Sequence, residues 1–352
     1  MNVDPQTKQM MSDGHANNFT ALRLFAAFLV LYGHAFDLYK LTAPSFIGWM
    51  PLGPVAVYIF FSISGYLISI SWERDNHIVR FVLKRALRIF PGLVVCILLT
   101  IFVLGTLTTT LPLGDYIKNP ETWAYAKNIF LYINYTLPGV FENNIYPRAV
   151  NGSIWSLPVE FAMYLIFACL ALILRNKWPQ RVGVFLLAAL FFVANYYIGL
   201  STTIIYSFPL QYLAICGIYF LIGVVIHQWG LLKILSAPNV LFSIIIWLSL
   251  SRWPILFEYA SYVIMPILVI AFGAGASKAF IWLDKYDYSY GVYIYAFPVQ
   301  QLISFYFFNY GLRFGIVVSA LVTLCLAALS WHWVEKPALQ YKKLFKTNSI
   351  KF

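Results

Sequence analysis

Long uninterrupted apolar runs are the feature that most constrains this chain. A helix needs about 20 apolar residues to cross the hydrocarbon core of a bilayer, and the sequence contains ten runs of about this length. They cover residues 18–39, 52–71, 90–111, 154–174, 182–200, 208–227, 235–250, 255–276, 287–308 and 312–332, and 235–250 is the weakest of them. Only 11% of the residues are charged, against about a quarter in soluble domains. The predicted fold class is all-α, a polytopic integral membrane helix bundle with about ten transmembrane helices.

The basic residues are distributed unevenly between the two sides of the predicted bundle. The formal net charge is +11, which in a soluble protein would suggest nucleic acid as a partner. In a membrane protein, lysine and arginine instead collect in cytoplasmic loops. Of the 24 such residues, 17 fall on the side of both termini, 6 on the opposite side, and Arg23 lies inside the first run. Both termini are therefore predicted to be cytoplasmic, and no nucleic-acid partner is expected.

The sequence shows no internal repeat, so residues 1–352 are predicted to form a single transmembrane domain. Residues 1–17 are a polar N-terminal segment and residues 334–352 a basic cytoplasmic tail. The first run contains Arg23, whereas the core of a signal peptide is uncharged, so this run is expected to be retained as a helix.

A long loop at 112–153 is predicted on the outer side. Its aromatic and polar residues suit a sugar ligand, and a merely covering loop fits them equally well.

Two polar residues within the first run are candidates for function. Arg23 and His34 are 11 residues apart, so at about 100° per residue they share one helix face, roughly 16 Å apart along the axis. Charged residues inside a span usually face the bundle interior and mark function. The alternatives are that Arg23 extends to the lipid headgroups and that His34 is a packed interior histidine.

The connection at residues 74–88 is strongly basic. Arg80, Lys84 and Arg88 recur at i, i+4 and i+8, opposite a set of apolar side chains. This is the pattern of an amphipathic helix that lies on the cytoplasmic membrane surface. One interpretation is attraction to anionic lipid. The other is a cradle for phosphate groups, because guanidinium groups pair well with phosphate oxygens.

Glu160 is an acidic residue about six positions into the fourth run, at a depth similar to that of His34. A buried carboxylate needs a partner, so Glu160 is a candidate for orienting the His34 ring; a structural pair elsewhere is the alternative. Asp37, nearer the surface, is the second candidate for that role.

Residues at the mouth of the fourth run are candidates for lining an acceptor site: Ser153, Trp155 and Ser156. No cysteine has metal-ligand spacing, and no metal site is predicted.

Six short segments resemble, in order, the motifs of the acyltransferase-3 family, and together they span nearly the whole chain. They are the Arg23–His34 pair, FFSISGYLI at 60–68, KRALRIFP at 84–91, NGSIWSLPVEF at 151–161, SYGVYIYAFPVQQ at 289–301 and WVEKP at 333–337. Many members of the family have a histidine where this chain has Ala296. Any chemistry that depends on that histidine is therefore not expected here.

The resemblance implies an O-acyltransferase of the bacterial inner membrane. Its donor substrate would be cytoplasmic acyl-CoA, most often acetyl-CoA, and its acceptor an envelope polysaccharide or lipid-linked saccharide, such as O-antigen or exopolysaccharide. No permanently bound cofactor is implied. The RxxR spacing favours Arg85 and Arg88 as the coenzyme phosphate site. His34 would act as general base on a sugar hydroxyl or be acylated itself, with Arg23 near the acyl-pantetheine arm.

A transporter or flippase for a lipid-linked sugar is the competing hypothesis. Intramembrane Arg, His and Glu residues would then form a substrate or proton path. Transporters often have two matched halves with interrupted helices, and the sequence shows no such halves.

Overall fold

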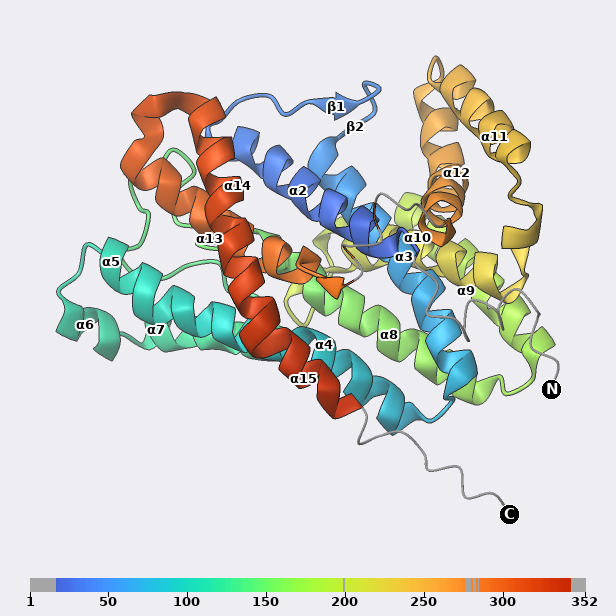
Figure 1. The fold of residues 1–352 in the computed structure, drawn as a ribbon, viewed down its shortest axis with the longest axis horizontal. Coiled ribbons are helices and arrows are strands. Elements are labelled where there is room, and N and C mark those ends of the chain that lie inside the picture. The colour runs from blue at the N-terminus through green and yellow to red at the C-terminus, as the bar shows by residue number, and fades with distance from the viewer. Residues whose placement is uncertain (1–16, 199, 276–279, 281–282, 284, 343–352) are drawn as a thin grey trace.

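The computed structural model describes residues 17–198, 200–275, 280, 283 and 285–342. Most of the predicted polar N-terminal segment and of the predicted basic tail lies outside these residues. The described chain is a bundle of helices with two short antiparallel hairpins (Figure 1). The hairpins pair β1 (Ser45–Phe46) with β2 (Met50–Pro51) and β3 (Ile204–Ile205) with β4 (Phe208–Pro209).

The long helices make up most of the bundle. They are α2 (Phe19–Leu38), α3 (Leu52–Arg74), α4 (Ile78–Leu99), α8 (Ser156–Ile173), α9 (Lys177–Tyr197), α10 (Leu210–Gln228), α11 (Ala237–Leu250), α12 (Pro254–Ala274), α13 (Ser289–Phe307) and α14 (Gly311–Ser330). Shorter helical segments connect or extend them. They are η1 (Thr100–Gly105), α5 (Thr106–Thr108), α6 (Leu113–Lys118), α7 (Pro120–Tyr125), η2 (Ala126–Phe130), η3 (Ser153–Trp155), η4 (Leu200–Thr202), η5 (Leu231–Ile234), η7 (Phe308–Tyr310), η8 (Trp331–Glu335) and α15 (Lys336–Gln340).

Each of the ten apolar runs corresponds to one long helix, which confirms the polytopic all-α fold class. Eight helical segments of the described chain are long and apolar enough to cross a membrane, and the last, Ser289–Gln340, contains both α13 and α14. Those two helices pack against each other after the chain reverses near Gly311 (Figure 1). Helix α11 has 14 residues, so it is about 21 Å long and shorter than the hydrocarbon core, about 30 Å thick. Its prediction as a full span is not supported.

The basic segment does not form a separate surface helix, and that prediction was wrong. Helix α4 begins at Ile78 and runs through the basic residues and Pro91 to Leu99, then continues as η1 and α5. Proline removes one backbone donor but permits a helix when neighbouring helices support it. The basic residues therefore belong to the first turns of a transmembrane helix, and this places two of them inside the bundle.

Helices α3 and α10 cross with their backbones in contact. A Cβ atom added at Gly65 would lie 1.8 Å from the carbonyl oxygen of Phe220, and one added at Gly223 would lie 2.3 Å from that of Ser62. Only glycine permits this approach, as in other membrane helix pairs that meet through small residues. Gly65 belongs to the second family-like motif, and Ser64 beside it faces the cavity described below.

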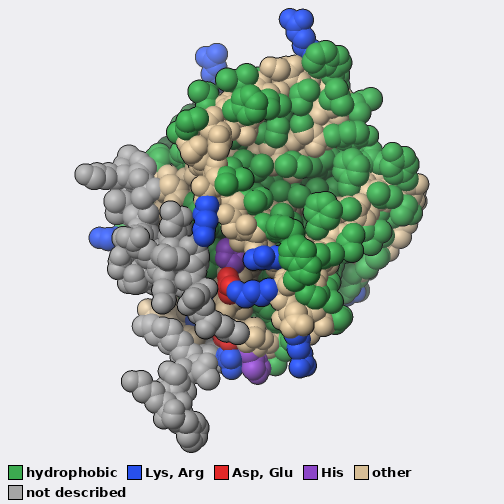
Figure 2. Space-filling model, turned by 90° about the vertical axis from the view of Figure 1, so that its right-hand side faces the viewer, with side chains coloured by type: hydrophobic (Ala, Val, Ile, Leu, Met, Phe, Trp, Pro, Cys, Tyr) green, Lys and Arg blue, Asp and Glu red, His purple; other side chains and the backbone are tan. Residues whose placement is uncertain are grey.

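Large apolar side chains cover much of the outer surface. Figure 2 shows broad apolar areas on one face, with basic, acidic and histidine side chains gathered in a small group among them. Exposed apolar side chains on three of the helices include Phe185, Leu186, Leu190, Val193, Leu241, Phe242, Ile245, Ile255 and Leu256. Surfaces of this size and character match lipid acyl chains rather than water.

The loop at 112–153 packs against the bundle. Tyr116 is fully buried and donates a hydrogen bond to the Ile101 carbonyl at 2.9 Å. The Gln301 amide of α13 donates to the carbonyls of Tyr146 at 2.8 Å and Ala149 at 2.7 Å. The far part of the loop is thereby held against the end of α13.

Candidate active site

A cavity of about 280 Å³ lies between α2, α3, α4, α8 and α13. Four cationic side chains line it: Arg23, Arg85, Arg88 and Lys342. Two acidic side chains line it as well, Asp287 and Glu160. The remaining wall is aromatic, aliphatic or hydroxyl-bearing, so the chamber combines apolar surface with polar groups and an excess of positive charge.

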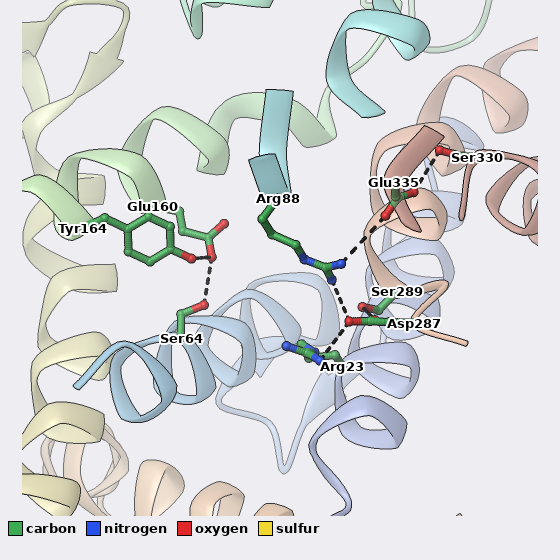
Figure 3. A network of polar contacts seen from close by, with 9 residues as sticks. All are labelled: Arg23, Ser64, Arg88, Glu160, Tyr164, Asp287, Ser289, Ser330 and Glu335. Carbon is green, nitrogen blue, oxygen red and sulfur yellow. Dashed lines mark hydrogen bonds and ion pairs between the residues drawn. The ribbon is translucent and has the colours of Figure 1, made fainter. Parts of the chain in front are cut away.

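Asp287, directly before α13, joins two of the arginines. Its Oδ2 accepts hydrogen bonds from Arg23 Nη2 at 2.9 Å and from Arg88 Nη2 at 2.8 Å (Figure 3). The Ser289 hydroxyl donates to its other oxygen at 2.5 Å. Burial raises the pKa of Asp287, but the two guanidinium groups outweigh it and lower the pKa to about 2. The carboxylate therefore stays charged and ties α2 and α4 to the start of α13.

Glu335, in the closing motif, supports this network from the other side. One of its oxygens lies 3.9 Å from Arg88 Nη1, and the other accepts a hydrogen bond from Ser330 at 2.9 Å (Figure 3). Arg88 is thus placed between two carboxylates. Its guanidinium is positioned by the protein before any ligand binds.

Arg85 and Lys342 differ from Arg23 and Arg88 because neither forms an ion pair within the described chain. Arg85 Nη2 donates to the Ser71 hydroxyl at 3.2 Å, while its buried Nε–H has no hydrogen-bond partner. Lys342 follows α15, and burial together with the nearby arginines lowers its pKa to about 7. An anion that enters the cavity can bind these two side chains without displacing a carboxylate.

The other basic residues of α4 face away from the cavity. Arg80 donates to both oxygens of Asp75, and Lys84 lies 2.6 Å from the same carboxylate. The pKa of Asp75 is lowered because the hydrogen bond from Arg80 outweighs the effect of burial. Arg80 and Lys84 therefore close the turn between α3 and α4, whereas Arg85 and Arg88 enter the cavity.

Glu160 lies in the cavity wall but does not contact His34, so the expected pairing was wrong. Its Oε1 accepts hydrogen bonds from the Ser64 hydroxyl at 2.8 Å and from the Tyr164 hydroxyl (Figure 3). Glu160 shares a chamber with Arg85 instead.

His34 is not among the residues that line the cavity and lies near the C-terminal end of α2, which is the end predicted to be outer. Its Nδ1 lies 3.3 Å from Asp37 Oδ2, and its ring meets the edge of Phe297 at a centroid distance of 5.2 Å. The His34 side chain is 21% exposed and that of Asp37 52%. Asp37, the second candidate, is therefore the observed partner. Arg23 and His34 share a helix face as predicted, yet they lie in two different environments.

The three residues expected to line an acceptor site have different surroundings. Ser153 is fully buried, its carbonyl accepts a hydrogen bond from the Tyr293 hydroxyl at 2.5 Å, and it does not line the cavity; its role in acceptor binding stays a prediction. Ser156 is bonded to the same Tyr293 hydroxyl at 2.6 Å and lines the cavity. Trp155 is half-buried and packs against Tyr212 at 4.6 Å.

Sequence reasoning missed several residues of this site: Ser64, Tyr164, Asp287, Lys342 and Glu335. Asp287 could have been predicted as a site residue, because a carboxylate next to the start of an apolar run needs a cationic partner. Ser64 and Glu335 lie inside motifs that were recognised, but nothing in their spacing indicated what they contact.

The fold and the cavity define a polytopic helical membrane protein with a chamber suited to an anionic ligand. The chain belongs to the acyltransferase-3 family, since the family model described as an acyltransferase domain matches residues 17–332. The protein is therefore an acyltransferase that transfers groups other than amino-acyl groups, as the motifs predicted, and the transporter hypothesis is set aside.

Three relatives extend this comparison. The O-acetyl transferase of Shigella phage Sf6 is 32% identical over 329 residues, covering 91% of this chain and 95% of the relative. Nodulation protein 10 of Rhizobium leguminosarum bv. viciae is 29% identical, covering 94% of this chain and 95% of the relative. The peptidoglycan O-acetyltransferase OatA of Listeria monocytogenes is 22% identical, covering 85% of this chain and 54% of the relative. No solved structure matches the chain.

Proposed function

We propose that this protein transfers an acetyl group from acetyl-CoA to a hydroxyl of a cell-envelope carbohydrate. The acceptor is a polysaccharide or a lipid-linked saccharide, and the membrane is the bacterial inner membrane. Two relatives are named as O-acetyl transferases, one of them for peptidoglycan, and all three come from bacteria or a bacteriophage. These names support both the acetyl group and the carbohydrate acceptor.

The observation that carries the donor assignment is the pair of cations without a carboxylate partner, Arg85 and Lys342. Coenzyme A bears phosphates at one end and a neutral pantetheine arm at the other. Phosphate oxygens fit the unpaired cations, because charge-assisted hydrogen bonds to phosphate are strong. The arm then follows the chamber past Glu160 and Tyr293 toward the outer half of the bundle.

The cavity end that holds these cations faces the cytoplasm in this proposal. The segments that form it are the start of α4 and the chain after α15. Both belong to the side of the protein that carries 17 of the 24 basic residues, and such residues collect on the cytoplasmic side. Acyl-CoA made in the cytoplasm would thus enter from its own compartment.

His34 is the proposed general base. Asp37 accepts a hydrogen bond from Nδ1–H, which leaves Nε2 with its lone pair available for the sugar hydroxyl proton. As that proton moves to His34, the sugar oxygen attacks the thioester carbonyl carbon. The carbon–sulfur bond then breaks, the sulfur receives the proton, and the products are the sugar ester and free CoA.

The test of the donor site compares two arginines on one helix. Arg85→Gln should raise the KM for acetyl-CoA and leave the KM for glycan unchanged. Arg80→Gln is the matched control, because Arg80 lies on the same helix but pairs with Asp75 outside the cavity. Purified protein in lipid vesicles would receive acetyl-CoA and glycan, and mass spectrometry would count the acetyl groups added. Equal donor KM values in the two variants would place the coenzyme elsewhere.

A further inference from the structure

The cavity ends short of His34. Its lining includes Phe60, Ser156 and Tyr293 but neither His34 nor Phe297, and the Phe60 ring packs against the Tyr293 ring at 5.7 Å. The Tyr293 hydroxyl is bonded to Ser156 and donates to the carbonyl of Ser153. A donor in this cavity therefore does not meet His34 as the side chains stand.

Phe297 lies on α13 between the lining residue Tyr293 and the ring of His34. It follows Tyr293 by four residues on α13, so it lies about 6 Å farther along the same helix face. Its ring meets the His34 ring at 5.2 Å and the Tyr146 ring at 6.1 Å. The Phe297 side chain is buried, with 2% exposure. One ring thus touches the candidate base and the ordered loop.

The loop next to Phe297 is shaped to receive that ring. A Cβ atom added at Gly152 would lie 2.7 Å from the Phe297 ring, so a larger residue at position 152 would displace it. On one side of the ring, Asn151 donates a hydrogen bond to the Ile294 carbonyl at 2.9 Å. On the other side, the Gln301 amide donates a hydrogen bond to the carbonyl of Tyr146 at 2.8 Å. The loop is therefore bonded to α13 both before and after Phe297.

We propose that Phe297 closes the passage between the donor cavity and His34, and thereby makes the enzyme select a sugar hydroxyl over water. This inference rests on the proposed function, since it requires the thioester to lie in the cavity. Binding of the glycan beside Tyr146 and His34 moves the ring and opens the passage. Without glycan the ring stays in place, and water near His34 does not reach the thioester from that side.

Water and the sugar hydroxyl compete for one reaction. In both cases an oxygen attacks the thioester carbonyl carbon, the carbon–sulfur bond breaks, and the sulfur receives the proton that the oxygen loses. The sugar yields an ester and CoA, whereas water yields acetic acid, which ionises, and CoA. Exclusion of water from a closed site is a recognised way to suppress such hydrolysis.

The experiment measures CoA release from acetyl-CoA by protein in vesicles, with and without glycan. Phe297→Ala should raise glycan-independent CoA release several-fold and lower the number of esters formed per CoA released. Phe305→Ala is the matched control, because Phe305 lies on the same helix, packs against Phe141 and is 41% exposed. It should behave as the wild type in both measurements.

Two further measurements make the outcome decisive. Phe297→Leu keeps most of the apolar volume and replaces the alanine variant if that variant fails to fold. It should raise glycan-independent CoA release by a smaller factor than alanine. Binding of acetyl-CoA is measured separately in the wild type and in Arg85→Gln. If acetyl-CoA binding depends on Arg85 but the position 297 variants release CoA no faster than the wild type, the proposal that Phe297 closes the passage is wrong. If binding does not depend on Arg85, the donor site itself is wrong.

Discussion

The two ends of helix α2, inner and outer in the predicted orientation, differ in how they are held. At the inner end, Arg23 belongs to a buried ionic network that joins α2, α4 and α13 through Asp287. At the outer end, His34 contacts the half-exposed Asp37 and the Phe297 ring within the described residues. At the inner end the Arg23 guanidinium is held by a buried ion pair, whereas at the outer end the His34 ring is partly exposed. Substitutions at the inner end should therefore affect folding and donor binding, and substitutions at the outer end should affect rate.

The largest expected effect is at His34. His34→Ala should lower acetyl transfer by about 10²–10⁴-fold, because it removes the proposed general base. His34→Gln should resemble alanine, since glutamine forms hydrogen bonds but does not accept the proton. Rates are measured at equal protein level in vesicles, together with thermal unfolding. Near-wild-type transfer by either variant would end the proposed role of the outer end in catalysis.

The next effect is at Asp287 and should appear in stability. Asp287→Asn leaves the Arg23 and Arg88 guanidinium groups without their shared anion, and breaking a buried ion pair costs about 3–5 kcal/mol. Because folding lowers the pKa of this carboxyl from 3.8 to about 2, its contribution is complete above pH about 4 and is lost as the pH falls through 2. Ser289→Ala, which removes one hydrogen bond, is the milder control, costing about 1 kcal/mol. Unchanged thermal unfolding of Asp287→Asn would show that the network is not structural.

Asp37 should have a smaller effect than His34. Asp37→Asn keeps an acceptor for Nδ1–H but removes the charge, and exposed ion pairs contribute only about 0–1 kcal/mol. The rate should therefore fall less than about tenfold, with no change in unfolding temperature. A loss as large as that of His34→Ala would mean that the carboxylate is shielded from water when glycan is bound.

The smallest effect is the pH dependence of donor binding. Lys342 has a pKa of about 7, so it loses its positive charge as the pH rises above 7. Acetyl-CoA should therefore bind more weakly at pH 8.5 than at pH 6.5, by about two- to threefold in total. The phosphate monoester of the coenzyme, with a second pKa near 6, gains charge over this range and acts in the opposite direction. In Lys342→Gln the weakening should disappear; if it persists, another group is responsible.

The helices could be predicted from the sequence, because hydrophobic length alone specifies them. The shared face of Arg23 and His34 was also predictable, since helical geometry fixes it. The contacts that these polar residues make with other helices could not be predicted. Glu160 was a candidate partner of His34 because the two lie at similar depth, but depth does not specify whether two side chains on different helices face each other. The contact of Asp287 with two arginines likewise depends on tertiary packing between segments far apart in the sequence.

The basic segment before Pro91 shows a second limit. Its periodicity identified a cationic stripe correctly but assigned all of it to the membrane surface. Arg80 and Lys84 pair with Asp75 at the turn, while Arg85 and Arg88 enter the bundle. A pattern of charge along one helix does not reveal which neighbour covers each face. The RxxR motif selected the two residues that line the cavity, where periodicity alone did not.

The crossing of α3 and α10 restricts how the enzyme can move during a catalytic cycle. Gly65 and Gly223 bring the two backbones into contact, and backbone atoms at this separation leave no room for one helix to slide along the other. Ser64, beside Gly65, is therefore part of a stationary wall of the chamber. In the proposed function, any adjustment of the chamber to a bulky donor would therefore fall to its other walls, among them the one that carries Lys342.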